Sequence, residues 1–496
     1  MLTHTANGDS RLSFWRRVRE FAVPPSMIDT ATARRRAGDW AGACAAAGID
    51  VDLNLRSVAR TQGHDLAARV RADLRHLAPD LLRWHMPRIA PDGLLRPGLT
   101  LTLARYGIAG REGSPPVHLV VRTPPARAEG GQRISLALWY GSGASGPETG
   151  APWHPHPRPN RRFRLDLHRH LWDARRTDEL RVRSGADLPF TDDPPQHLGL
   201  PAHSGLCEYP DLPGHPGLPG TMPPGRRCAV DRWAAEAVVL LRAEGLPTAG
   251  THTVTVRLGV GRRLALELVA DRFGAGPHVL RIGEARTGGA ASALPVLPVL
   301  PVLPDAATWV PPDLELVRAG AIEADRLHPL VASALVPDHV PTASPRTPGP
   351  AGGTRLVECR GARHRIGLVD GALAALDHDP AEIRREEMLA ALTGTPLPCL
   401  QVIDEAHRRP ECLPDIRERL NHGDTAGALA VVEALLGPAA RLRDGALRDE
   451  LEAAALRRIT YGMFRAGLDE PGPGRVGPDR HRPRVGRSHP RHATRA

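Results

Sequence analysis

The chain has 496 residues, of which 41% are hydrophobic, and its formal net charge is +10. This length favours two or more domains, since a domain typically has about 150 residues. The 50 glycines and 50 prolines indicate long loops or linkers. No stretch is long and apolar enough to span a bilayer, and charged residues interrupt the N-terminal segment where a secretion signal would have its apolar core. We therefore expect a cytoplasmic protein with no membrane contact.

The sequence contains no lysine, so all 65 basic residues are arginine. This excludes a lysine Schiff base, a lysine general base and a phosphate-binding loop that uses lysine. The six cysteines form no Cys-x-x-Cys pair, which argues against a zinc ribbon, a thioredoxin motif and an iron–sulfur spacing. We expect buried, reduced thiols.

Residues 1–95 are predicted to be a helical N-terminal region. Apolar residues recur three or four positions apart within residues 11–22 and 66–77, as is typical of amphipathic helices. Between these segments, Gly38 and Asp39 predict a helical corner, because glycine ends helices and aspartate caps them.

Residues 96–295 are predicted to form an antiparallel α+β region, because the hydrophobic period changes from helical to alternating. Residues 141–228, rich in proline, glycine and histidine, interrupt it as a loop or disordered insert. A helix from Asp231 to Arg242 follows this insert. The candidate strands are Leu99–Tyr106, Val117–Arg122, Arg133–Trp139, Phe163–Leu171, Thr253–Leu258 and Leu264–Val269.

Residues 296–353 are predicted to be a proline-rich spacer with short helices. Val-Leu-Pro repeats run from residue 296 to Pro304, and proline at every third position favours polyproline II over a central strand. At the other end of the chain, residues 469–496 form a basic tail that is predicted to be disordered.

Residues 354–468 are predicted to be a β-hairpin followed by a helical bundle. Asp370-Gly371 is a hairpin turn signal, and Asp379 before a proline is a strong helix start. Gly423-Asp424 repeats the corner of Gly38-Asp39. Short turns between consecutive helices favour antiparallel packing.

Two stretches of this bundle carry a resemblance. From Asp377 to Gly394 and from Arg419 to Glu433, the chain resembles an uncharacterised protein family of GC-rich actinobacteria, and the similarity extends over most of the length. No activity comes with that family, so the resemblance implies only a bacterial, cytoplasmic origin. The corner at residues 422–424 also resembles one tetratricopeptide-type helical hairpin, although solenoids need several stacked repeats.

Asp404-Glu405-Ala406-His407 looks like the Mg²⁺-binding box of a DEAH helicase. That chemistry requires a buried strand before the aspartate and a glycine-rich loop with lysine on the phosphates. Gln401 breaks the apolar run before Asp404, and the chain has no lysine. We therefore predict a partly solvated helix here.

The strongest metal candidate in the sequence is Asp166, His168 and His170. On a strand these three side chains would share one face, and a carboxylate with two imidazoles can hold zinc or iron if further ligands converge. His154, His156 and Asp173 are nearby candidates for such further ligands. A solvated face beside an arginine-rich loop is the alternative.

Three other patterns are weaker. Gly141–Gly146 fits a dinucleotide fingerprint, but a proline-rich loop follows where a helix is needed. Residues 50–61 start like a calcium loop and lack its glycine and final glutamate. A possible zinc set with no standard spacing is His203, Cys207, His215 and Cys228.

The predicted fold class is α+β, with a helical N-terminal part, short antiparallel sheets in the middle and a C-terminal helical bundle. We predict a non-enzymatic intracellular scaffold or protein-interaction protein with no cofactor. The first alternative is a nucleic-acid-associated protein that contacts phosphates through the arginines of its tail, since such contacts need no base recognition. The second alternative is a metal-dependent enzyme at Asp166, His168 and His170.

Overall fold

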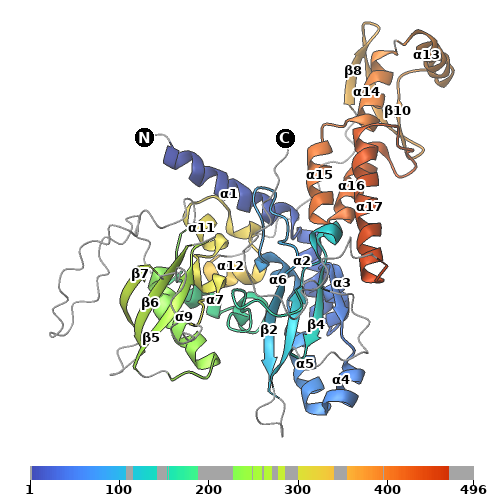
Figure 1. Ribbon diagram of the computed structural model, residues 1–496. Helices are drawn as coiled ribbons and strands as arrows, with labels where there is room; N and C mark the ends of the chain where they lie inside the picture. The colour runs from blue at the N-terminus through green and yellow to red at the C-terminus, as the bar shows by residue number, and fades with distance from the viewer. Residues whose placement is uncertain are drawn as a thin grey trace, which may run out of the picture.

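The computed structural model has an α+β fold, as predicted (Figure 1). The residues it describes are 3–107, 115–141, 154, 156–187, 227–247, 250–259, 262–270, 278–284, 300–339, 355–394 and 396–468.

The N-terminal part is helical, which confirms the prediction for this region. Asp39 accepts a hydrogen bond from the backbone N–H of Gly42 at 2.8 Å, and Gly38 has a φ of +79°. The predicted corner is therefore present. The helices are α1 (Thr3–Phe21), α2 (Pro25–Arg36), α3 (Trp40–Ala46), α4 (Leu55–Gln62), α5 (His64–His76) and α6 (Pro79–His85).

A four-stranded sheet packs against these helices in the order β1-β4-β3-β2. Three of its strands confirm strands predicted from the sequence, and they pair antiparallel. The fourth, β1, pairs parallel with β4 and was not predicted, because a four-residue strand has too little pattern. The strands are β1 (Ile49–Asp52), β2 (Thr100–Tyr106), β3 (Val117–Arg122) and β4 (Ile134–Trp139).

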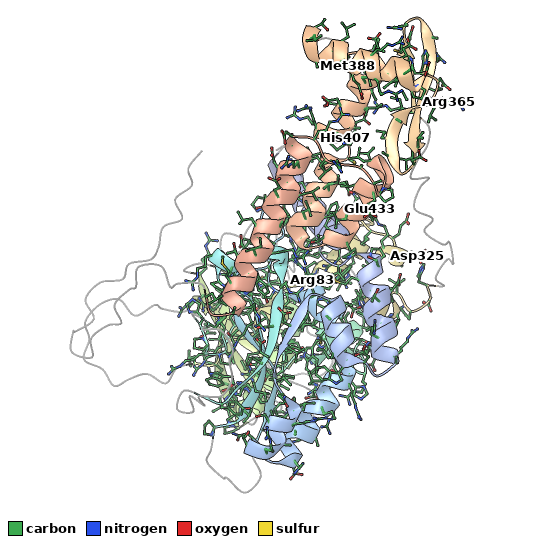
Figure 2. The ribbon with its side chains drawn as sticks, turned by 90° about the vertical axis from the view of Figure 1, so that its right-hand side faces the viewer. Arg83, Asp325, Arg365, Met388, His407 and Glu433 are labelled. Atoms are coloured by element: carbon green, nitrogen blue, oxygen red, sulfur yellow. The ribbon has the colours of Figure 1, made fainter. Side chains whose placement is uncertain are left out.

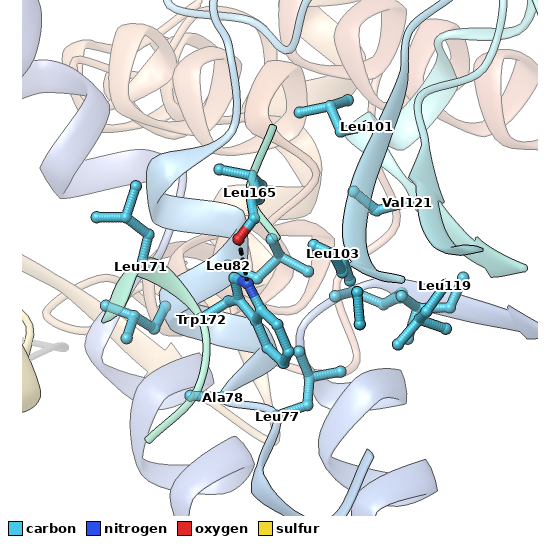
Figure 3. Packing of buried hydrophobic residues seen from close by; sticks show 14 of the residues in the cluster. Leu77, Ala78, Leu82, Leu101, Leu103, Leu119, Val121, Leu165, Leu171 and Trp172 are labelled. Atoms are coloured by element: carbon cyan, nitrogen blue, oxygen red, sulfur yellow. Dashed lines mark hydrogen bonds between the residues drawn. The ribbon is translucent and has the colours of Figure 1, made fainter. Parts of the chain in front are cut away.

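The main hydrophobic core draws its residues from Cys44 to Leu335. Near its centre, the indole N–H of Trp172 donates to the carbonyl of Leu165 at 3.0 Å (Figure 3). The predicted boundary at residues 95 and 96 is therefore not a packing boundary, because both sides of it contribute to one core.

A second core lies between a three-stranded antiparallel sheet and helix α9 (Val230–Ala243). Two of its strands, β5 (Gly250–Arg257) and β6 (Arg263–Ala270), confirm the predicted hairpin, and β7 (His278–Glu284) completes the sheet. The end of the Val-Leu-Pro segment belongs to this core. Leu303 is fully buried, and its N–H donates to the carbonyl of Thr255 at 2.8 Å.

Short helices complete the part of the molecule formed by the described residues between 3 and 339, here called the body. They are η1 (Ala126–Ala128), η2 (Gly130–Gln132), η3 (Arg169–Leu171), α7 (Glu179–Ser184), α10 (Asp305–Thr308), α11 (Pro312–Arg318), η4 (Ala324–Arg326) and α12 (Pro329–Leu335).

Residues 355–468, here called the C-terminal arm, project from the body (Figure 1). The predicted hairpin is confirmed, and its turn has positive φ at both Asp370 (50°) and Gly371 (77°). The arm's sheet has the order β10-β9-β8. Its elements are β8 (Arg355–Cys359), β9 (Ala362–Val369), β10 (Ala372–Ala375), α13 (Pro380–Thr393), α14 (Pro398–Arg408), α15 (Leu413–His422), α16 (Thr425–Leu436) and α17 (Ala446–Arg465).

The arm is attached to the body by α15 and α17. The buried guanidinium of Arg83 donates to the carbonyl of His422 at 2.8 Å and to that of Ala22 at 2.9 Å. On α17, Arg465 pairs with Asp52 of β1 at 2.6 Å. None of the helices that the structure describes is both long enough and apolar enough to cross a bilayer.

Candidate metal centre

Cys359, His378 and Cys399 meet between the arm's small sheet and α14. One ligand atom of each lies within 4.8 Å of those of the other two. Over the described part of the chain, they are the only group of three or more His, Cys, Asp or Glu residues that could hold a metal ion in this way. The three residues are 19 and 21 positions apart in the sequence, so the fold of the arm brings them together.

Local structure fixes each of these positions. Cys359 is the last residue of β8 and lies opposite Ala362 across a two-residue turn, in which Arg360 and Gly361 both have positive φ. His378 lies directly before the N-cap of α13. Cys399 follows Pro398 in the first turn of α14, where the positive end of the helix dipole favours a thiolate.

The cluster is shielded from solvent. Cys359 and Cys399 are buried, and the side chain of His378 is 4% exposed. The two cysteines belong to an apolar cluster with Ile366 and Ile403. Burial, followed by the hydrogen bond to Cys359, raises the pKa of Cys399 to about 11. Without a cation, the thiol is therefore protonated at neutral pH, and a metal ion would release its proton on binding.

His378 presents one free nitrogen to this cluster. Its Nε2 is buried and has no hydrogen-bond partner, whereas its Nδ1 lies 3.8 Å from a carboxylate oxygen of Glu382. Metal-binding histidines typically have a carboxylate near the second ring nitrogen, which orients the ring. We therefore assign Nε2 as the ligand atom.

The donor set is two sulfurs and one imidazole nitrogen. Thiolates and imidazole together favour Zn²⁺, whereas Mg²⁺ and Ca²⁺ prefer oxygen ligands. The residues present therefore fit a zinc ion.

The structure does not place Asp166, His168 and His170 as the sequence predicted. The strand prediction for Phe163–Leu171 is wrong: an isolated bridge at Arg164 is followed by a turn and then by η3. The carboxylate of Asp166 accepts two hydrogen bonds from Arg164, both at 2.8 Å. Because the chain turns here instead of remaining extended, alternate residues do not share one face.

The two histidines of that prediction do lie close together, with ring centroids 5.7 Å apart. The Nε2 of His168 lies 3.2 Å from the carboxylate of Glu236, and its Nδ1 is 3.0 Å from the carbonyl of Arg164. His170 is buried, and burial lowers its pKa well below the usual value. Asp166 thus belongs to an arginine pair, and His168 belongs to a separate pair with Glu236.

The helicase-like tetrad lies on a helix, as predicted. Asp404 is in α14 and pairs with Arg408 and Arg443, each at 2.8 Å. This carboxylate follows no buried strand. Several residues named in the other predictions lie outside the described part of the chain: 142–146, His203, Cys207, His215 and the basic tail.

The cysteine–histidine cluster was missed by sequence reasoning because its ligands have no standard spacing. Local signals did exist. Cys359 precedes a tight turn, His378 precedes a strong N-cap, and Cys399 follows a proline that starts a helix. Each signal fixes a position within one element, but none indicates that the three elements meet.

Comparisons of the chain with protein-family models, with curated proteins and with solved structures gave no match. Inference about function therefore depends on the geometry of the chain itself.

Proposed function

We propose that this protein is a non-enzymatic interaction protein, and that a zinc ion held by Cys359, His378 and Cys399 stabilises the outer end of its C-terminal arm. The observation that carries the proposal is the convergence of two buried thiols and a partnerless imidazole nitrogen. Two thiolates would neutralise the charge of the ion, which lowers the cost of burying it.

The small size of the apolar core supports a stabilising role for the metal. The buried members of the cluster between the sheet and α14 are Cys359, Ile366, Cys399 and Ile403. Helix α13 contributes no buried residue. Small units with so little core usually need a metal, a disulfide or a partner to be stable.

The surface of α13 supports a role in binding other proteins. Met388, Leu389 and Leu392 are 63%, 50% and 86% exposed, and Met388 lies near the outer end of the arm (Figure 2). An apolar helix face of this kind fits into an apolar groove of a partner protein. The proposed compartment is the cytoplasm, where reducing conditions keep thiols available for a metal.

Elemental analysis of the purified full-length chain tests this proposal. We expect about one zinc per chain in the wild type and its loss in Cys399→Ser. Cys412→Ser is the matched control, because Cys412 lies in the same arm outside the cluster, and it should retain the metal. Absence of zinc from the wild type would contradict the proposal.

Elemental analysis and a nucleic-acid binding assay together separate the alternatives that the sequence left open. Loss of the metal in His168→Ala, with retention in Cys399→Ser, would favour the site at Asp166, His168 and His170. Binding of nucleic acid that weakens with salt and disappears on deletion of residues 471–496 would favour the role of the basic tail.

A further inference from the structure

His364 lies beside the three-residue cluster. It is in β9 and pairs with Val357 of β8. Because Cys359 pairs with Ala362, two residues before His364, the side chains of Cys359 and His364 leave the sheet on the same face. The ring of His364 stacks on that of His378, with centroids 4.1 Å apart and an angle of 11° between the ring planes.

Each of these two histidines has a buried nitrogen without a partner. The atoms are Nδ1 of His364 and Nε2 of His378. A buried polar atom that is left unsatisfied costs about 1–3 kcal/mol. The Nε2 of His378 lies near the two thiols, and a metal ion held there could accept a lone pair from each of the two nitrogens.

The nearby carboxylates are already engaged. Asp377 accepts hydrogen bonds from the Arg365 side chain, the shortest at 2.7 Å. Glu382 accepts from Arg360 at 2.5 Å and has its other oxygen near Nδ1 of His378. His364, by contrast, has a buried nitrogen with no hydrogen-bond partner.

We propose that His364 is the fourth ligand, and that Cys359, His364, His378 and Cys399 enclose one Zn²⁺ in a closed tetrahedral site. This inference rests on the proposed function above and specifies its metal site. Zn–N distances of 2.0–2.1 Å place two ligating nitrogens about 3.4 Å apart. Without a metal, only Cys359, His378 and Cys399 have ligand atoms within 4.8 Å of one another, so the ring of His364 must leave its stack on His378 and reorient when the ion binds.

The number of protein ligands distinguishes a catalytic zinc site from a structural one. Three protein ligands leave a position for water or substrate, which is the arrangement of catalytic zinc, whereas four ligands close the site and make it structural. The closed site ties together four separate segments: the end of β8, the middle of β9, the residue before the N-cap of α13, and the first turn of α14.

Cobalt substitution in the full-length chain tests the inference, because Co²⁺ reports its coordination by visible absorption. The wild type should show the intense bands of a tetrahedral ion together with thiolate charge transfer. His364→Ala should still bind Co²⁺, at least about tenfold more weakly, with weaker bands as water enters. His407→Ala is the matched control, since His407 is a buried histidine of α14 that is not part of the cluster.

His364→Cys provides a second readout that does not depend on loss of binding. If residue 364 faces the metal, this variant should keep tetrahedral bands and gain charge-transfer intensity from a third thiolate. Spectra and affinities of both His364 variants equal to those of the wild type would overturn the fourth ligand and leave the three-residue site intact. A wild-type chain that binds neither Co²⁺ nor Zn²⁺ would instead overturn the proposed function.

Discussion

Gly38 and Gly423 occupy equivalent positions in two copies of one helical corner. Both end a helix with positive φ, at +79° and +87°, and each is followed by an aspartate that caps the next helix. Their surroundings differ. A Cβ on Gly38 would meet nothing within 4 Å, whereas a Cβ on Gly423 would lie 2.2 Å from the carbonyl oxygen of Gly131.

This difference predicts unequal costs for the same substitution. Gly38→Ala should lower the free energy of unfolding by about 1 kcal/mol, through backbone strain alone. Gly423→Ala should lower it by at least about 3 kcal/mol, since the overpacking of a rigid backbone contact adds to the same strain.

Denaturant unfolding of the two variants, monitored by circular dichroism, measures these costs. Gly38→Ala serves as the control, because it shares the φ and lacks the close contact. Equal destabilisation by the two substitutions would show that the corner at Gly423 is not tightly packed against Gly131.

At the scale of single elements, sequence patterns succeeded where local interactions decide the structure. Asp370-Gly371 predicted a hairpin, because a turn with two positive φ values favours these residue types. Asp379 predicted the start of α13, and its side chain does accept a hydrogen bond from the N–H of Ala381 at 2.9 Å. Both signals lie within four residues of the structure that they specify.

The patterns failed where distant segments decide the structure. The alternation around Leu165 and Leu167 predicted a strand, but the N–H of His168 donates to the carbonyl of Leu165 in a turn. Leu165 is buried in the main core and Leu167 packs against the second core. Periodicity alone cannot distinguish a strand from a turn that places its apolar residues in two different cores.

We expect a partner protein to bind through the apolar face of α13. Leu392→Glu should change the free energy of unfolding by less than about 0.5 kcal/mol, because Leu392 is 86% exposed. The same substitution should abolish binding of a partner that receives α13 in an apolar groove, since a buried, unpaired carboxylate is costly.

Comparative affinity capture with the full-length chain as bait tests this expectation. Leu246→Glu is the matched control, because Leu246 is an exposed leucine of the body. Proteins that are retained by the wild type and by Leu246→Glu but not by Leu392→Glu would be partners of α13. An identical set of retained proteins for all three baits would contradict binding through this helix.

At the scale of the whole molecule, the arm has an inner and an outer end with different supports. The inner end is fixed to the body by Arg83, whose guanidinium donates to backbone carbonyls of η2, of α15 and of Ala22, the residue after α1. Its burial lowers the pKa of Arg83 to about 10, so the group remains charged at neutral pH. The described residues of the outer end, 355–408, pack mainly in the small apolar cluster around Ile366 and Ile403, and Leu373 and Ala406 also contact the larger cluster of the arm.

Metal removal should therefore act on the outer end alone. A ligand that binds only the folded state at 100 times its dissociation constant stabilises that state by about 2.7 kcal/mol. Chelation of zinc should lower the free energy of local opening in residues 355–408 by at least about this amount. The main core should change by less than about 0.5 kcal/mol, because it shares no residue with the cluster.

Hydrogen exchange followed by mass spectrometry resolves the two parts of the molecule in one experiment. Amides of β8, β9 and α14 should lose protection on chelation, whereas those of α5 and β3 should keep it. The Cys412→Ser chain should respond as the wild type does, and the Cys399→Ser chain should resemble the chelated state before any chelator is added. Loss of protection spread evenly over body and arm would show that the cluster supports the whole fold, and an unchanged exchange pattern would show that no metal stabilises the arm.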